Sequence, residues 1–376
     1  MAKLGDIATY INGYAFKPQD WSDEGIPIIR IQDLTGNSYQ ANRYNGEYAS
    51  KYEVNNGDVL ISWSASLGVY IWHGEKAVLN QHIFKVVFDK ERISKDFFVH
   101  QVGLILENAA SDAHGATMKH LTKPVFDALP FYLPPYEKQC EIAEVLDEVT
   151  SLISLRKQQL AKLDELVKAR FVEMFGDPVY NEMHWETKRL IDICRTIVDC
   201  PHSTPHYTTK DTGYKCIRTS AVKKNKILWE KVECISKQEY EERIKRKRPE
   251  KGDVIYTREG AILGIAAVID RDYNVALGQR SMLLSPDIYQ CTPCFLSMAM
   301  NFDSFLGKAL GGVSGSASPH INVGDIKALE IIAPPIEIQN QFSTFVEQVD
   351  QQKQTVQQSL EKLELMKKAL MQEYFG

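Results

Sequence analysis

The 376-residue chain has no apolar run near the roughly 20 residues that a membrane-spanning helix requires, and residues 1–6 lack the apolar core of a signal peptide. Its seven cysteines are odd in number and mostly isolated, which is typical of reduced thiols in a cytoplasmic protein. The net charge of −5 gives no general attraction for nucleic acid, so a DNA-binding surface has to be local or be completed by partners. These absences predict a cytoplasmic protein that does not enter a membrane, and the length allows two or three domains.

Signatures of catalysis are also missing. No glycine-rich loop that would hold a phosphate or a dinucleotide follows a predicted strand. The motif Cys291-Thr-Pro-Cys294 has no second pair to complete four zinc ligands; Cys194, Cys200 and His202 are the remaining candidates, and ordinary thiols are the favoured interpretation. The serine-rich stretch 314–318 lacks the strand and tight turn that present a catalytic serine. We therefore expect no catalytic residue, no metal and no cofactor on this chain.

A short proline motif occurs twice, as Leu133-Pro-Pro-Tyr-Glu-Lys-Gln139 and as Ala333-Pro-Pro-Ile-Glu-Ile-Gln339. Enzymes that methylate base amino groups carry a Pro-Pro-aromatic loop, in which a preceding Asp or Asn accepts hydrogen bonds from the flipped base. Leu133 and Ala333 occupy that preceding position, and neither has a polar side-chain atom. A helix start fits better, because proline is favourable in the first turn and the following glutamate complements the helix dipole. The motif therefore predicts the beginnings of two helices.

The chain is similar to itself. Residues 134–176 align without a gap to residues 334–376 at an offset of 200, and upstream matches continue at offsets that begin at 186. The upstream pairs are Leu4/Leu190, Arg30/Arg218, Gly57/Gly252, Gly68/Gly264, Gln81/Gln279 and His120/His320. An ordered series of this kind indicates a tandem duplication with pseudo-twofold symmetry. We divide the chain into a first head (residues 1–133), a first spacer helix (134–177), a second head (178–333) and a second spacer helix (334–376).

Both spacer segments have apolar residues at spacings of three and four, which predicts helices of roughly 38 residues, or ~57 Å each. An apolar stripe this long and narrow needs a partner, and the other spacer helix is the natural one. The second head starts at the far end of the first helix. If the two helices are antiparallel, this head does not have to span the length of the first helix to reach the start of the second. The residues expected at the interface of this antiparallel coiled coil are Val145, Val149, Leu160, Leu163, Phe345, Val349, Leu360 and Leu363.

Each head has the mixed short strands and helices of an α/β (α+β) domain. The expected strands are residues 26–31, 58–62 and 83–88 in the first head and 214–218, 253–257 and 281–284 in the second. Loops between matching strands differ between the heads and are rich in residue types that contact DNA bases and phosphates. The same scaffold with different loops predicts two related DNA-binding domains with different targets.

The candidate DNA-binding residues share a polar or cationic side chain in or beside these loops. In the first head they are Lys17, Arg30, Gln32, Arg43, Tyr44, Ser64, Gln81, His82 and Lys119. In the second head they are His202, Thr204, His206, Tyr207, Arg218, Thr219, Lys224, Arg246, Arg258, Gln279 and Arg280. Two alternatives stay open: the basic run 243–248 is either a phosphate-binding patch or a solvated helix face, and Arg30 and Arg218 are either base contacts or structural arginines.

Several local motifs together indicate a family. They are Gly13-Tyr-Ala-Phe-Lys-Pro18, Gly57-Asp-Val-Leu-Ile61 with Gly252-Asp-Val-Ile255, Cys200-Pro-His-Ser-Thr-Pro205, and the two Pro-Pro-x-Glu-x-Gln helix starts. With these motifs the chain resembles, over essentially its whole length, the specificity (S) subunits of type I restriction-modification systems. The resemblance implies that each head is a target-recognition domain for one half of a bipartite, asymmetric DNA site.

The resemblance also implies partners. The spacer helices would set the distance between half-sites and dock two methyltransferase (M) subunits, with endonuclease-translocase (R) subunits joining the complex on double-stranded DNA. S-adenosylmethionine, ATP and magnesium are then expected on those partners. Two alternatives are a specificity subunit of a related restriction system of type IIB or IIG, and a scaffold whose heads bind proteins. Salt-dependent binding to duplex DNA distinguishes the scaffold from the DNA-binding functions.

Overall fold

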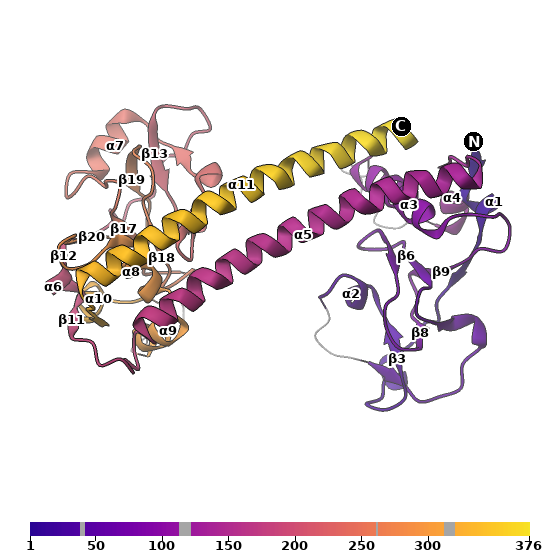
Figure 1. Cartoon of the computed structure of the whole chain (residues 1–376), viewed down its shortest axis with the longest axis horizontal. Coiled ribbons are helices and arrows are strands. Elements are labelled where there is room, and N and C mark those ends of the chain that lie inside the picture. The colour runs from indigo at the N-terminus through magenta and orange to yellow at the C-terminus, as the bar shows by residue number, and fades with distance from the viewer. Residues whose placement is uncertain (38–41, 113–121, 261, 312–319) are drawn as a thin grey trace. The chain divides into compact units, whose positions relative to one another are not determined.

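The structure, a computed structural model, describes residues 1–37, 42–112, 122–260, 262–311 and 320–376 (Figure 1). The chain divides into two compact units. The first unit comprises residues 1–158 and 357–376, and the second comprises residues 159–356. Because these boundaries cut through both long helices, the division into two heads and two spacer helices stays a prediction. Among the described residues, no helix combines the length and apolar character needed to cross a membrane.

The first unit contains two four-stranded sheets and one strand pair. The first sheet has the order β2-β9-β6-β7, with β2 (Thr9–Asn12), β6 (Val59–Ser62), β7 (Gly68–Ile71) and β9 (Ile83–Val87). The second has the order β4-β3-β8-β5, with β3 (Ile26–Ile29), β4 (Arg43–Tyr44), β5 (Glu53–Val54) and β8 (Ala77–Leu79). Strands β1 (Ala2–Lys3) and β10 (Pro130–Phe131) form an antiparallel pair. The helices are α1 (Leu4–Ile7), α2 (Ile31–Leu34), α3 (Lys95–Asp112) and α4 (Lys123–Asp127).

The main sheet of the second unit repeats the strand pairing of the first. This sheet has the order β12-β20-β17-β18, with β12 (Cys194–Asp199), β17 (Val254–Thr257), β18 (Ala266–Val268) and β20 (Ser281–Pro286). A second sheet joins β16 (Glu233–Cys234), β13 (Tyr214–Ile217) and β19 (Asn274–Leu277). Two pairs remain, β11 (Thr187–Arg189) with β21 (Glu330–Ile332), and β14 (Val222–Lys223) with β15 (Lys226–Ile227). The helices are α6 (Leu190–Ile193), α7 (Lys237–Arg243), α8 (Pro293–Met300), α9 (Asp303–Leu310) and α10 (Val323–Ala328).

The six strands predicted from the sequence are confirmed to within two residues at either end. The strand predicted at 26–31 stops earlier, at Ile29, because α2 begins at Ile31. The carboxylate of Asp33 accepts the backbone N–H of Arg30 at 2.8 Å and so satisfies a donor at the start of this helix. Arg30 therefore caps a short helix instead of continuing the strand.

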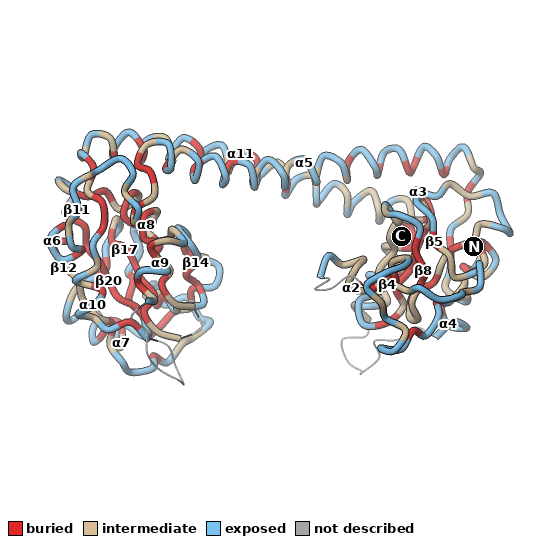
Figure 2. Tube along the Cα trace, turned by 90° about the horizontal axis from the view of Figure 1, so that it is seen from below, coloured by how far each residue is buried: buried red, intermediate tan, exposed pale blue. Residues whose placement is uncertain are grey.

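Two long helices, α5 (Tyr136–Phe175) and α11 (Ile336–Phe375), contain 40 residues each, which confirms the helices predicted after the proline pairs. Proline is tolerated at a helix start because the first N–H groups have no intrahelical acceptor. Helix α5 ends at Phe175, and the next residue, Gly176, has a φ of +72°. Glycine adopts this left-handed conformation without strain. Figure 2 shows buried positions recurring between exposed ones along both helices.

Within each unit, α5 and α11 run in opposite directions. In the second unit the contacts pair Asp164 with Lys353, Arg170 with Phe345, and Phe175 with Phe342, so rising numbers on one helix meet falling numbers on the other. In the first unit Lys157 is paired with Glu364 at 2.9 Å. The start of α5 and the end of α11 also pack into one apolar core, through Ile142, Leu146, Leu370 and Phe375 among others.

Apolar residues from each sheet and the long helices form the cores. In the first unit, the face of β6 and β9 packs with α3 and the start of α5, and Phe375 lies 5.4 Å from Phe97. In the second unit, Phe171 and Phe175 of α5 lie 5.7 and 4.9 Å from Phe295 of α8. Ring contacts at these distances stabilise an interface beyond the area that they bury. The main sheet of each unit is therefore tied to the long helices through a shared core that includes aromatic residues.

Candidate nucleic-acid interface

The two main sheets pair in the same register at one end of three strands, which are β2, β9 and β6 in the first unit and β12, β20 and β17 in the second. In the first unit Asn12 pairs with Phe84 and Ser62 with Ile83; in the second unit Asp199 pairs with Met282 and Thr257 with Ser281. The next residues, Trp63 and Arg258, donate their backbone N–H to the carbonyls of His82 and Arg280 at 3.2 and 3.0 Å. This ladder makes Asn12, Trp63 and His82 positional equivalents of Asp199, Arg258 and Arg280. We name these two triads the first and second strand-end sites.

The second strand-end site is held by a buried ion pair. Arg258 donates from Nε and Nη2 to the two carboxylate oxygens of Asp199, at 2.9 and 3.1 Å. The side chains are 9% and 15% exposed, so the pair is largely removed from water. Burial of a charge is tolerated only when a partner and hydrogen bonds compensate it. Arg258, a predicted DNA contact, therefore has its fork of donors occupied by Asp199.

Three more predicted residues surround Asp199. His202 Nε2 lies 3.1 Å from the carboxylate, and Arg246 Nη1 donates to the Asp199 carbonyl at 3.3 Å. Gln279 Nε2 donates to the carbonyl of His202 at 2.5 Å. The loop that begins with Cys200-Pro-His is thereby attached to the sheet. Together with Arg280, the structure brings five of the eleven second-head candidates to one place.

The first strand-end site has the same framework with neutral chemistry. Trp63 Nε1 donates to Asn12 Oδ1 at 3.1 Å, where the second site has Arg258 and Asp199. The ring of Trp63 lies 4.9 Å from His82 and stacks at 5.6 Å on Phe84, which is almost fully buried. A polar link therefore holds the same position in both units, through an aromatic residue in one and a cation in the other.

Three of the other first-head candidates make local side-chain contacts. The Arg30 side chain is 14% exposed and pairs with Asp33 at 3.3 Å, and the choice between a base contact and a structural arginine stays open. Arg43 donates to the Gly25 carbonyl and to Glu75, and Tyr44 donates its hydroxyl to the Glu47 carbonyl. Lys17 is exposed, Gln32 and Gln81 are half-buried, Ser64 is buried, and Lys119 lies outside the described residues.

The remaining second-head candidates differ in their contacts and in their exposure. Arg218 is half-exposed, pairs with Glu233 at 2.7 Å and stacks 4.5 Å above the ring of Tyr207, whose pKa is raised by burial. Arg218, like Arg30, lies just past its strand and not within it. Lys224 pairs with Asp303 at 2.7 Å. His206 and Thr204 are exposed, and Thr219 is half-buried.

The basic run 243–248 is neither a uniform patch nor a fully solvated face. Arg243 is 6% exposed and donates to the backbone carbonyls of Leu277 and Ser203. Lys245 and Lys247 pair with Glu242 and Glu250 on the surface. Arg246 is the member of the run that reaches the second strand-end site.

The seven cysteines are free thiols in the structure. The described residues contain no group of three or more His, Cys, Asp or Glu side chains close enough to ligate an ion. Burial raises the pKa of the Cys194 thiol to about 12 and that of Cys291 well above its usual range, so both stay protonated at neutral pH. Their interpretation as ordinary thiols stays a prediction.

The glutamine of each proline motif attaches a long helix to its sheet. Gln339 is fully buried; its Oε1 accepts the N–H of Thr292 at 2.9 Å, and its Nε2 donates to the carbonyls of Gln290 and Pro334 at 3.0 and 2.8 Å. Gln139 accepts the N–H of Ser94 and donates to the Pro134 carbonyl, both at 2.9 Å. We name these contacts the glutamine clamps.

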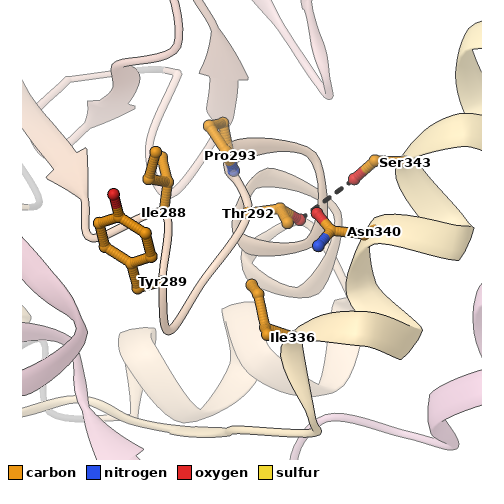
Figure 3. A pocket seen from close by; sticks show the side chains of 7 residues that line it. All are labelled: Ile288, Tyr289, Thr292, Pro293, Ile336, Asn340 and Ser343. Atoms are coloured by element: carbon orange, nitrogen blue, oxygen red, sulfur yellow. Dashed lines mark hydrogen bonds between the residues drawn. The ribbon is translucent and has the colours of Figure 1, made fainter.

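A hollow lies beside the second clamp, between the loop before α8 and the first turns of α11 (Figure 3). Ser343 of α11 and Thr292 at the start of α8 are hydrogen-bonded through their hydroxyls at 3.2 Å, and Figure 3 shows this link across the hollow. Ile288 and Tyr289 on its rim are 54% and 83% exposed. An exposed aromatic and aliphatic pair beside a hollow is typical of a protein-binding surface.

The residues predicted for the helix interface differ in burial. Val149, Leu163, Val349 and Leu360 are buried, and Leu160, Leu363 and Phe345 are half-buried. Val145 is 37% exposed, because the buried stripe passes through its neighbours Ile142, Leu146 and Val149 at spacings of four and three. Their role as an interface between the long helices remains a prediction.

Sequence reasoning missed Asn12, Trp63 and Asp199 as site residues. A signal was present, because the offset of 195 that matches Gly57 with Gly252 also matches Trp63 with Arg258. Residue types alone, however, do not show that an asparagine–tryptophan contact and an aspartate–arginine contact are equivalent. Only the shared register of the two sheets shows that these pairs occupy one position.

Comparison with known proteins identifies relatives along the whole chain. The family model described as "Type I restriction modification DNA specificity domain" matches residues 1–165 and 182–365. The type I restriction enzyme EcoBI specificity subunit of Escherichia coli is 25% identical over 374 residues, covering 92% of this chain and 78% of the relative. The MjaVIII specificity subunit of Methanocaldococcus jannaschii is 23% identical over 393 residues, covering 99% and 90%.

Solved structures share the fold. The type I restriction-modification S subunit from M. genitalium superposes with a TM-score of 0.57 at 12% identity, covering all of this chain and 95% of the other. A chain from a structure of type I R-M complex assembly and conformational transition gives a TM-score of 0.57 at 17% identity, covering 100% and 96%. Both curated relatives are named as specificity subunits of type I restriction enzymes. With both of its halves matched by the family model, the chain belongs to the type I restriction modification DNA specificity family.

Proposed function

We propose that this chain is the DNA specificity subunit of a type I restriction-modification complex, in which each head recognises one half of a bipartite, asymmetric DNA site. The observation that carries the proposal is the pair of strand-end sites. Their backbone register is the same, while their side chains are Asn12, Trp63 and His82 in one and Asp199, Arg258 and Arg280 in the other. Equal scaffolds with unequal polar groups at one place are what two domains need to distinguish different base sequences.

The heads are residues 1–133 and 178–333 of a tandem duplication. Its support is the matching order of strands in the two main sheets and the matching glutamine clamps, in which Gln139 and Gln339 hold equivalent N–H groups at the same distance of 2.9 Å. The spacer helices, residues 134–177 and 334–376, form an antiparallel coiled coil that separates the half-sites. The opposite helix directions within each unit support this arrangement.

The spacer helices also dock two methyltransferase subunits, and endonuclease-translocase subunits join the complex in the cytoplasm. Large apolar side chains remain exposed on these helices in the first unit, with Leu155 at 55% and Leu365 at 69%. The hollow rimmed by Ile288 and Tyr289 adds a similar surface in the second unit. Exposed apolar side chains of this kind are covered when a partner binds. S-adenosylmethionine, ATP and magnesium belong to those partners.

Exchange of the second head tests this function. Residues 184–333 are replaced with the corresponding head of another specificity subunit, the full chain is purified with its methyltransferase subunits, and a pool of randomised duplexes is selected at fixed salt. We expect one half-site of the bound sequence to change and the other to stay. A change in both half-sites would contradict the two-domain model.

The same selection distinguishes the alternatives. Binding with no base preference and no dependence on salt indicates a protein-binding scaffold, because phosphate contacts release counterions and weaken steeply with salt. A bipartite site cut at fixed positions by the assembled complex indicates a system of type IIB or IIG instead of type I. The first result would contradict the DNA-binding function, and the second would contradict only the assignment to type I.

A further inference from the structure

We propose that the residue at the left-handed position of each strand-end site, His82 or Arg280, contacts a DNA base, and that Arg280 recognises a guanine. This inference rests on the proposed function and extends it, because it names the residue and the base in the second half-site.

The backbone at both positions is unfavourable for a residue with a side chain. His82 and Arg280 have φ angles of +72° and +68°, in the left-handed region where a Cβ atom crowds the following carbonyl. Glycine adopts this conformation freely, yet both units have a long polar side chain there. Strained residues of this kind are concentrated where a side chain has to meet a ligand. The strain is the same in both units while the side chain differs, which fits a position used for recognition.

Arg280 is the arginine of the second site whose donors are available. Arg258 is bound by both oxygens of Asp199, and Arg246 donates to the Asp199 carbonyl. Arg280 is exposed, and its side chain has no ion pair with any carboxylate of the described residues. Its Nη1 lies 3.3 Å from where a Cβ of Gly260 would be, so the absence of a side chain at Gly260 leaves room for the guanidinium.

The chemistry of Arg280 matches one base. An arginine fork donates two hydrogen bonds to O6 and N7 of guanine in the major groove, and no other base edge presents two acceptors in that arrangement. The cations Arg246 and Arg258 both bind Asp199 beside it, and cationic side chains favour a nearby phosphate backbone. His82 is half-buried and packed against Trp63, and an imidazole lacks the fork of an arginine, so it is expected to discriminate less strongly.

The test uses the full chain in complex with its methyltransferase subunits and a pool of randomised duplexes. The variants are Arg280→Gly, which relieves the left-handed strain, and Arg280→Lys, which keeps the charge but loses the fork. Arg271→Ala removes an exposed arginine of the same unit as a matched control. We expect Arg280→Gly to lower the preference for guanine at one position of one half-site by roughly 5- to 150-fold, with no loss of Tm. Arg280→Lys should lose most of that preference while retaining more affinity than Arg280→Gly.

Three results would overturn the inference. An affinity loss that is equal for all sequences assigns Arg280 to a phosphate, and an unchanged selection removes it from the interface. A change in both half-sites shows that the variant acts through the fold. A wild-type complex without any base preference refutes the proposed function itself, before the variants are compared. His82→Gly provides the reciprocal measurement, with a weaker and separate effect expected in the other half-site.

Discussion

Replacing Gln339 with alanine should destabilise the second unit by about 2–4 kcal/mol. The substitution removes three hydrogen bonds, of 2.8, 2.9 and 3.0 Å, from a fully buried side chain. The largest contribution is the N–H of Thr292, which is itself 6% exposed and loses its acceptor. A buried donor left without a partner costs ~1–3 kcal/mol, and the two unpaired carbonyls and lost packing add to this value.

Gln139 and Gln352 calibrate this effect. Gln139 makes two such bonds, and the Ser94 N–H that it accepts is only half-buried, so Gln139→Ala should cost less, at ~1–2 kcal/mol. Gln352 is exposed on α11, so Gln352→Ala should stay within ~0.5 kcal/mol of the wild type. Gln339→Glu introduces a further test, because a carboxylate would face two carbonyls in a buried site.

The sign of the pH effect follows from that environment. Burial and the facing carbonyls raise the pKa of the introduced carboxyl in the folded state above its unfolded value. Its stability contribution is therefore present at low pH and is lost as pH rises through the folded pKa. Relative to wild type, Gln339→Glu should be less destabilised at acidic than at neutral pH, whereas the cost of Gln339→Ala should not depend on pH.

Chemical denaturation and hydrogen exchange measure these changes. The free energy of unfolding is compared among the four variants, and exchange is followed in peptides that contain Thr292 and Ser94. The reasoning is refuted if Gln339→Ala lies within 0.5 kcal/mol of Gln352→Ala, or if Gln139→Ala costs more than Gln339→Ala. Faster exchange at Thr292 without any change at Ser94 is the local result expected for Gln339→Ala.

Three further predictions concern other parts of the chain. Asp199→Ala should cost roughly 3–5 kcal/mol because Arg258 is left buried and unpaired, and adding Arg258→Met should recover most of this loss in denaturation experiments; a double variant less stable than the single one contradicts it. A thiol reagent should label Cys140 rapidly in the native protein and all seven cysteines in denaturant, since five thiols are buried and Cys294 is half-buried with its pKa raised to about 12; rapid native labelling of Cys291 refutes it. Four residues inserted into both α5 and α11 lengthen each helix by ~6 Å and should widen the gap between half-sites by about two base pairs with neither sequence altered; duplex selection measures the gap, and an unchanged gap excludes the spacer role.

The elements could be predicted because their signals are local. Proline pairs mark both long helices to within two residues, and the strands around Val59–Ser62 and Val254–Thr257 are continuous apolar runs. The apolar pattern predicts a strand that continues to residue 31, beyond its observed end at Ile29. The hydrogen bond from the Arg30 N–H to Asp33, three residues later, starts a helix there, and an apolar pattern carries no signal for such a polar contact. The pattern of apolar spacings tolerates a shift of one residue, and it predicts Val145 at the helix interface. In the structure Leu146 is buried and Val145 is 37% exposed.

The sequence by itself determined the repeated order of sheets and long helices, because hydrophobic spacing, proline and glycine act over a few residues. Only the tertiary structure decided which polar residues remain available for DNA. Residue type makes Arg30, Arg43, Arg218, Arg258 and Arg280 equivalent candidates, yet the first four are paired with the carboxylates of Asp33, Glu75, Glu233 and Asp199. Arg280 differs because the turn before β20 holds it exposed in a left-handed conformation, and that difference depends on contacts between segments about 80 residues apart.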